Sequence, residues 1–190
     1  MREKRFGQDE NGATALEFAL ISPVFFLLFF GIIEYSLVMY TKSVMEGATN
    51  VTSRLGKTGF TKEGVSRKQM LIDLLTERSN GVMDPEKIEV TTLVYESFDS
   101  IGKPEPFTDL NGNGVRDPDE PYVDVNGNGF WDSDMGRAGL GGAGDIVVYQ
   151  VRYDFPVNTP VLKNIIGNDA GNMPLRVNVV VRNEPYENIR

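Results

Sequence analysis

A stretch in the middle of the chain has the residue types and spacing of a calcium-binding loop. It follows the pattern D-x-[DN]-x-[DN]-G-x5-E, in which oxygen-bearing side chains recur at alternate positions around a sharp turn. The matching residues are Asp109, Asn111, Asn113, Gly114, Asp117 and Glu120, and Val115 stands where a backbone carbonyl is needed. Ca²⁺ takes six to eight oxygens, and the last Glu can bind it through both carboxylate oxygens. The spacing therefore predicts one bound Ca²⁺.

The same pattern begins again fifteen residues further along the chain. Its members are Asp124, Asn126, Asn128, Gly129 and Asp132, with the carbonyl of Phe130 in the place of that of Val115. The last position holds Met135, so the bidentate acid is missing, and Asp134 is the acid nearest to it. The second loop therefore predicts a second and less complete calcium site.

Two other interpretations apply to these loops. A complete EF-hand needs an entering helix, and Pro104 and Pro106 in the preceding segment are incompatible with one. The Asn-Gly pairs are also typical of hairpin turns surrounded by solvated acids. Turns account for the Asn and Gly residues but not for phased Asp residues that occur twice, so we expect calcium loops without flanking helices. Calcium would also favour a domain that faces out of the cytosol.

Composition excludes several classes of function. The 190 residues carry a net charge of -8, and residues 105–134 contribute -7 of it, which argues against nucleic-acid binding. The chain has no Cys and no His, so thiol nucleophiles, disulfides, zinc sites and His-based acid/base chemistry are absent. We predict that the protein is not an enzyme.

An apolar run near the N-terminus predicts a membrane-spanning helix. Phe18 to Ile33 contains no charge but is only about 24 Å long as a helix. Extension to Tyr40 gives about 34 Å, enough for a hydrocarbon core of about 30 Å, so the predicted span is about 18–40. A cleavable secretory signal is the rival interpretation, but Glu34 and Tyr35 occupy the place where small residues should precede cleavage. An acid at Glu17 inside such a run is costly and is a functional hypothesis by default.

Gly12, followed by Glu17 and Phe18 at the border between a polar leader and the apolar run, resembles the class III signal of type IV pilin-like proteins. The resemblance implies that a prepilin peptidase removes residues 1–12 on the cytoplasmic side by cutting between Gly12 and Ala13. It also implies that Glu17 pairs with the new α-amino group of a neighbouring subunit during assembly.

The stretch "GATALEFALISPVFFLLFFGIIEYSLVMY" resembles more closely the TadE-like branch of pseudopilins, which are minor components of Flp/Tad (tight adherence) pili. Members typically start GAxAxEFAL and carry Glu-Phe or Glu-Tyr just past the span. "YDFPVNTPVL" and "VVVRNEP" near the C-terminus are also similar to that family, whereas residues 60–144 are not covered. The resemblance implies a bacterial inner-membrane protein with a periplasmic head that enters a pilus through helix contacts with other pilins.

The remaining elements predict an α+β fold, with a long N-terminal helix packed on a small antiparallel sheet. We expect the first helix over 13–55, a second over 62–78, and strands at 87–95, 145–155 and 175–183. Residues 56–190 form the head, residues 105–135 are an inserted acidic segment, and 158–172 is a loop with a short helical turn. "GRAGLGGAG", from Gly136 to Gly144, is expected to be a flexible connector.

Two functions remain open from sequence. The first is a minor pseudopilin, processed after Gly12 and assembled through its N-terminal helix. The second is a single-pass, unprocessed membrane protein whose calcium-loaded loop presents an adhesive surface.

The Gly-Lys-Thr in "LGKTG" lacks the first glycine of a phosphate-binding loop and follows no strand. The charges flanking the span do not decide its orientation.

Overall fold

The computed structural model describes residues 10–57 and 66–184. They form two compact units, one made of residues up to Tyr40 with Phe155–Met173 and the other of Thr41–Asp154 with the residues from Pro174 on. The predicted α+β arrangement of a long apolar helix and a small antiparallel sheet is confirmed.

The first helix, α1, covers Glu10–Lys57 and ends close to the predicted residue 55. Its apolar side chains from Leu16 to Ile33 are exposed, whereas a stripe with three- and four-residue spacing is buried from Glu34 on. This stripe contains Glu34 and Val38 in one unit and Thr41, Met45, Ala48, Thr49 and Thr52 in the other. In the described residues α1 alone is long and apolar enough to cross a membrane.

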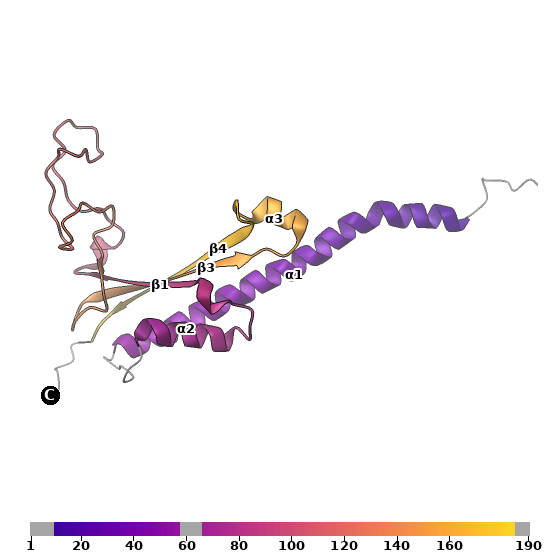
Figure 1. The fold of residues 1–190 in the computed structure, drawn as a ribbon, viewed down its shortest axis with the longest axis horizontal. Helices are drawn as coiled ribbons and strands as arrows, with labels where there is room; N and C mark the ends of the chain where they lie inside the picture. Colours follow the sequence, from indigo (N-terminus) through magenta and orange to yellow (C-terminus); the bar gives the residue numbers. More distant parts are fainter. Residues whose placement is uncertain (1–9, 58–65, 185–190) are drawn as a thin grey trace, which may run out of the picture. The chain divides into compact units, whose positions relative to one another are not determined.

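The sheet has the strand order β2-β1-β3-β4. Figure 1 labels its three long strands, β1, β3 and β4. The strands are β1 (Ile88–Tyr95), β2 (Arg137–Ala138), β3 (Ile146–Pro156) and β4 (Asn172–Arg182). β1 and β3 pair antiparallel, from Ile88 opposite Tyr153 to Tyr95 opposite Ile146. The three predicted strands are confirmed, although β4 begins three residues earlier than expected.

The expectation of a flexible connector at residues 136–144 was wrong for Arg137 and Ala138. These residues form β2, in which Ala138 pairs with Leu93, and the next N–H, of Gly139, donates to Thr92 O at 3.1 Å. The physical reason is that the outer edge of β1 offers unpaired N–H and C=O groups, which a short strand can satisfy.

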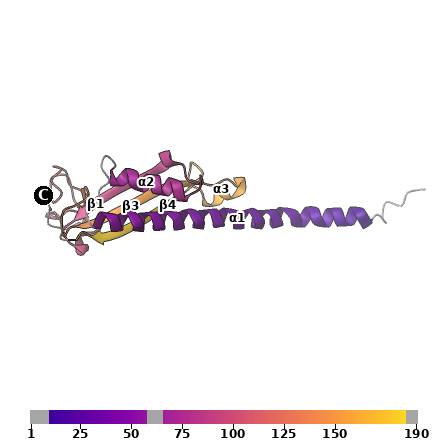
Figure 2. The ribbon, with the colours of Figure 1, turned by 90° about the horizontal axis from the view of Figure 1, so that it is seen from below.

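The second helix, α2, covers Arg67–Arg78 and is shorter than predicted. It starts at Arg67 because the side chain of Ser66 caps it by accepting the N–H of Gln69 at 3.1 Å. Residues 62–65 of the expected helix lie outside the described residues. Figure 2 shows α2 alongside the C-terminal part of α1.

Gly56 of α1 permits close packing against the sheet. A Cβ at this position would stand 2.2 Å from the hydroxyl of Tyr149 on β3, so only glycine fits there. β3 itself is almost continuously buried from Ile146 to Val151, as expected for a strand in the middle of a core. Two 3-10 turns, η1 (Pro85–Lys87) and η2 (Phe98–Ser100), flank β1.

The predicted helical turn between the last two long strands is α3, Pro160–Ile166. It lies in the same unit as the first part of α1. Pro160 at its first position has the fixed φ that suits a helix start.

Candidate functional site

The acidic segment between β1 and β2 folds into two adjacent loops, called here the first loop (residues 109–120) and the second loop (residues 124–135). Figure 1 shows that this segment has no regular helix or strand and extends away from the end of β1. Its stem is braced by an antiparallel bridge between Phe107 and Tyr122 and by hydrogen bonds from Thr108 N to Pro121 O and Val123 N to Pro106 O, both at 2.8 Å.

The carboxylate of Asp109 organises the first loop. Its Oδ1 accepts the N–H of Gly112 at 2.6 Å and of Asn113 at 3.2 Å, and its Oδ2 accepts the N–H of Gly114 at 2.8 Å. These donors, led by that of Gly114, hold the pKa of Asp109 below its usual value. Gly114 has a φ of 76°, which a residue with a Cβ rarely adopts.

Asp117 closes the other side of the first loop. Its Oδ2 accepts the side-chain amides of Asn111 at 2.6 Å and Asn113 at 3.0 Å. Hydrogen bonds therefore join the predicted position-1, -3, -5 and -9 residues to one another.

The second loop repeats this network bond for bond. Asp124 accepts the N–H groups of Gly127, Asn128 and Gly129 at 2.7, 3.2 and 2.8 Å. Asp132 accepts the side-chain amides of Asn126 at 2.7 Å and Asn128 at 2.5 Å. The two loops thus have one local structure, although only the first has the full sequence pattern.

Glu120, the last acid of the first loop, lies beneath it with only 4% of its surface exposed. One carboxylate oxygen accepts the N–H of Leu110 at 2.8 Å and the other that of Asp117 at 3.0 Å. The two ends of the loop are therefore held by a single side chain.

Glu105 does the same for the second loop, although it precedes both loops in the chain. It is fully buried, and its Oε1 accepts the N–H of Val125 at 2.8 Å while its Oε2 accepts that of Asp132 at 3.1 Å. Val125 and Asp132 occupy the loop positions that Leu110 and Asp117 occupy in the first loop. Motif matching missed Glu105 because a linear pattern looks for the last acid downstream.

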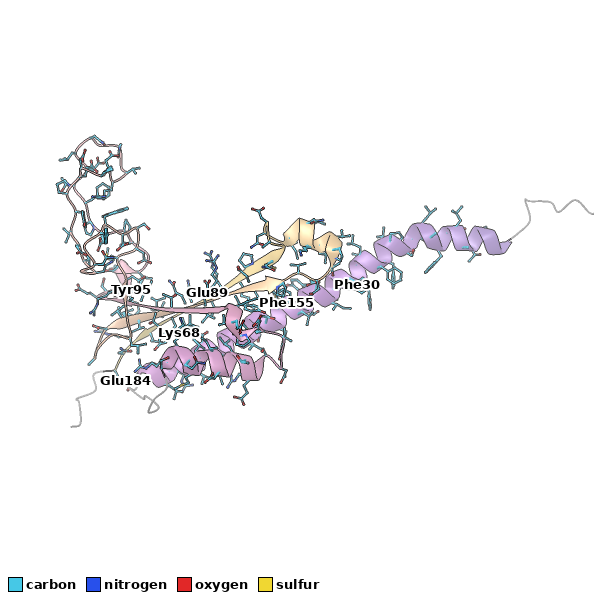
Figure 3. All side chains as sticks on the ribbon, in the orientation of Figure 1. Phe30, Lys68, Glu89, Tyr95, Phe155 and Glu184 are labelled. Atoms are coloured by element: carbon cyan, nitrogen blue, oxygen red, sulfur yellow. The ribbon has the colours of Figure 1, made fainter. Side chains whose placement is uncertain are left out.

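Met135 and Asp134 have other roles in the structure. Met135 packs against the buried cluster of Tyr95, Ile146 and Val148, which explains an apolar side chain at the last position of the second loop. Asp134 accepts the hydroxyl of Tyr95 at 2.9 and 3.0 Å through its two oxygens. Tyr95, labelled in Figure 3, is 3% exposed, and burial together with Asp134 raises its pKa to about 12.

Arg116 and Trp131 connect the two loops. The guanidinium of Arg116 lies 4.8 Å from the ring centre of Tyr122 and 5.7 Å from that of Trp131, within cation–π range. The indole N–H of Trp131 donates to the carbonyl of Glu105 at 2.9 Å. The aromatic side chains and Arg116 give the segment a small core of its own.

The loops can offer a hard cation such as Ca²⁺ a set of oxygen ligands only if carboxylates are combined with other oxygen types. Across the described ranges 10–57 and 66–184, no three acidic side chains gather into a group that could hold a metal ion by themselves. Each loop instead combines carboxylates with Asn amide oxygens and backbone carbonyls, the oxygen types that Ca²⁺ accepts.

The processing and assembly residues predicted from sequence lie on the exposed part of α1. No atom of the described residues lies within 4 Å of the place where a Cβ of Gly12 would stand, so packing among them does not require a glycine there. Glycine inside a helix costs roughly 0.5–1 kcal/mol relative to alanine. Glu17 and Phe18 are exposed as well, and Glu17 has no hydrogen-bond or ion-pair partner among the described residues.

Glu34 has a structural role that the sequence did not reveal. Its carboxylate, 4% exposed, accepts the backbone N–H groups of Asn158 at 3.0 Å and Thr159 at 3.1 Å. It also accepts the Thr159 hydroxyl at 2.8 Å. Glu34 therefore fastens the segment that leads into α3 to the side of α1.

Comparisons with known proteins agree with the first part of the chain. Residues 12–54 match the model of the family described as TadE-like protein. Neither the curated proteins nor the solved structures give a significant match. This match spans Gly12, Glu17, the exposed apolar segment of α1 and Glu34, so the N-terminal part of the chain is similar to TadE-like proteins, a family associated with the Flp/Tad pilus system.

Proposed function

We propose that this protein is a minor pilin that enters, or initiates, a Tad pilus through its N-terminal helix after removal of residues 1–12. The observation that carries the proposal is the state of Gly12 and Glu17 in the fold. Gly12 lowers the stability of the helix, and no other described residue packs against the place of its Cβ. Glu17 is an acid in an exposed apolar segment and has no partner in the part of the chain that the structure describes. The contacts within the isolated chain explain neither residue, whereas processing would explain Gly12 and assembly would explain Glu17.

A free amino group at Ala13 would supply the cation that Glu17 lacks. In an apolar environment an unpaired carboxylate is costly, so the pairing of Glu17 with the N-terminus of a neighbouring subunit stabilises the packed helices. The exposed apolar side chains on all sides of α1 between Leu16 and Ile33 provide the remaining contacts, either to lipid or to other pilins.

The test is co-expression with the prepilin peptidase of a Tad system and measurement of the intact mass. The expected result is loss of residues 1–12 from the wild-type chain and from Gly31→Ala, and no loss from Gly12→Ala. Gly31 is a matched control because it is also a helical glycine of α1 with room for a Cβ, its nearest neighbour being a Leu162 methyl at 3.9 Å. An unchanged wild-type mass would favour the unprocessed adhesive module instead. Cleavage of Gly12→Ala as efficient as that of the wild type would contradict the role proposed for Gly12.

We further propose that the two acidic loops bind Ca²⁺ and that calcium braces the head. A specific observation favours this second role. The two loops share one network, in which the carboxylates of Asp109 and Asp124 accept backbone N–H groups within the loops, while those of Glu120 and Glu105 accept backbone N–H groups at the base. Under this proposal Glu105 supplies to the second loop the acid that Glu120 supplies to the first. Loops that project from the head would then be rigid enough to contact another subunit or a surface.

A further inference from the structure

The short helix α3 carries an apolar face that the fold leaves largely uncovered. At 100° per residue, Val161, Leu162, Ile165 and Ile166 occupy one side of this helix, while Lys163 and Asn164 occupy the other. Val161, Ile165 and Ile166 are 53%, 67% and 44% exposed. This pattern is that of an amphipathic helix lying at an interface.

The position of α3 on α1 is fixed by two contacts within one compact unit. Thr159, just before α3, is bound by Glu34, and a methyl of Leu162 lies 3.9 Å from the Cβ position of Gly31. Gly31 and Glu34 are about one helical turn apart and lie on the same side of α1. From Thr159 to Leu162, α3 therefore runs back along α1 toward the apolar segment.

The apolar side chains of α1 at this level are also exposed. Ile32 is 67% exposed, and Phe30, labelled in Figure 3, is 47% exposed. The uncovered face of α3 is thus continuous with the uncovered surface of the candidate membrane span. From Glu34 onward one side of α1 is instead buried within the protein, and the buried side chains there include the polar Glu34 and Thr41.

We propose that α3 lies in the membrane interface beside α1, with Val161, Ile165 and Ile166 among the lipid chains and the boundary of the hydrocarbon at Gly31–Glu34. The span then runs from Ala13 to Ile33, and these 21 residues are about 31 Å long, close to the hydrocarbon thickness of about 30 Å. This places the boundary about two turns earlier than the predicted end at Tyr40. The inference does not rest on processing or pilus assembly.

A helix of seven residues would bind a membrane weakly on its own. Glu34 compensates for this weak binding because it tethers α3 to α1, which is itself held in the membrane. The tether raises the effective concentration of the apolar face of α3 at the bilayer. Lys163, on the opposite face, can keep its ammonium group among the phosphates while its methylenes lie over apolar atoms.

The test uses the full chain in vesicles of phosphatidylcholine and phosphatidylglycerol at a high lipid-to-protein ratio. The chain has no Cys, so single cysteines can carry nitroxide labels without other changes. Accessibility to oxygen, which concentrates in lipid, is compared with accessibility to a water-soluble nickel chelate. Phe25→Cys is the lipid reference and Asp169→Cys, in the exposed loop after α3, is the water reference.

The expected result is a lipid-like label at Ile165→Cys and a clearly more water-accessible one at Asn164→Cys, its neighbour on the opposite face. Met39→Cys, inside the originally predicted span, should resemble Asp169→Cys. A label at Ile165 that is as accessible to nickel as that at Asp169 would overturn the proposal, as would a lipid-like label at Met39. Protection of Ile165 that disappears on dilution with lipid would show that a second copy covers this face, and a water-accessible Phe25 would show that α1 does not span. Both outcomes would also overturn it.

Discussion

Glu34 and Thr159, 125 residues apart in the chain, are joined by two hydrogen bonds to a single carboxylate oxygen, one from the Thr159 N–H at 3.1 Å and one from its hydroxyl at 2.8 Å. The other oxygen accepts the N–H of Asn158 at 3.0 Å. Thr159 precedes α3 without capping it through its own side chain. An acid on the first helix therefore determines where a segment near the end of the chain is held.

Replacement of Glu34 by Ala should release residues 157–167 from α1 while the sheet stays folded. Three donors lose a charged acceptor, and such bonds contribute about 1.5–3 kcal/mol each at most, so local opening is the cheapest response. Hydrogen exchange should rise at least tenfold in this segment and stay unchanged in β1 and β3. Glu46→Ala, an exposed acid on the same helix, should change neither. Equal exchange in both variants would contradict the tethering role.

Tyr95 should make the stability of the head sensitive to alkaline pH. Its pKa is raised from 10.0 to about 12 by burial and by Asp134, so the folded state favours the neutral phenol. The contribution of Tyr95 to the free energy of unfolding is therefore complete below pH 10, where Tyr95 is neutral in both the folded and the unfolded state. It is lost as the pH rises from 10 to 12.

The measurement is chemical unfolding between pH 9 and 12, together with the absorbance of tyrosinate. Tyr95→Phe should flatten the fall in stability between pH 10 and 12 and remove one late-titrating phenol from the seven of the chain. Tyr35→Phe, at an exposed position, is the control and should leave the fall unchanged. A Tyr95→Phe profile identical to wild type would show that Tyr95 titrates normally.

Local sequence patterns were sufficient to predict the helices and long strands, because apolar spacing and β-branched runs act over a few residues. Arg137 and Ala138 were missed because the open edge of β1, and not any propensity of the glycine-rich segment, makes them a strand. The partner of Glu34 and the place of Glu105 beneath the second loop were missed for a related reason. Both depend on contacts between residues 20 or more apart in sequence, which a linear pattern does not encode.

Calcium should raise the melting temperature of the full chain, and a chelator should reverse the rise. A ligand at a hundred times its dissociation constant stabilises the folded state by about 2.7 kcal/mol, which is readily detected. Asp109→Ala and Asp124→Ala should each remove part of the shift and the double variant all of it. Asp99→Ala, which replaces an exposed acid outside the loops, should have no effect.

Trp131 in the second loop should sensitise bound terbium, and Asp124→Ala should reduce this emission more than Asp109→Ala. Absence of both terbium emission and a chelator-sensitive shift would rule out the metal proposal.

Glu105→Gln should weaken calcium binding at the second loop alone, by tenfold or more, which corresponds to about 1.4 kcal/mol or more. Gln keeps the size of the side chain and one acceptor oxygen, but it lacks the charge and the second carboxylate oxygen that we propose Glu105 offers to Ca²⁺. The sites can be separated by measuring Glu105→Gln in two backgrounds with calorimetric titration. With the second loop disabled by Asp124→Ala, Glu105→Gln should have little further effect, whereas with the first loop disabled by Asp109→Ala it should show its full effect.

Glu120→Gln should give the mirror image of this pattern, because Glu120 holds the first loop as Glu105 holds the second. Asp134→Asn distinguishes Glu105 from the acid that sequence alone placed nearest to the missing position. Since Asp134 accepts the hydroxyl of Tyr95, its replacement should alter the alkaline titration of Tyr95 and leave calcium affinity unchanged. If Asp134→Asn lowers the affinity for calcium and Glu105→Gln does not, then Asp134, and not Glu105, is the acidic ligand of the second loop.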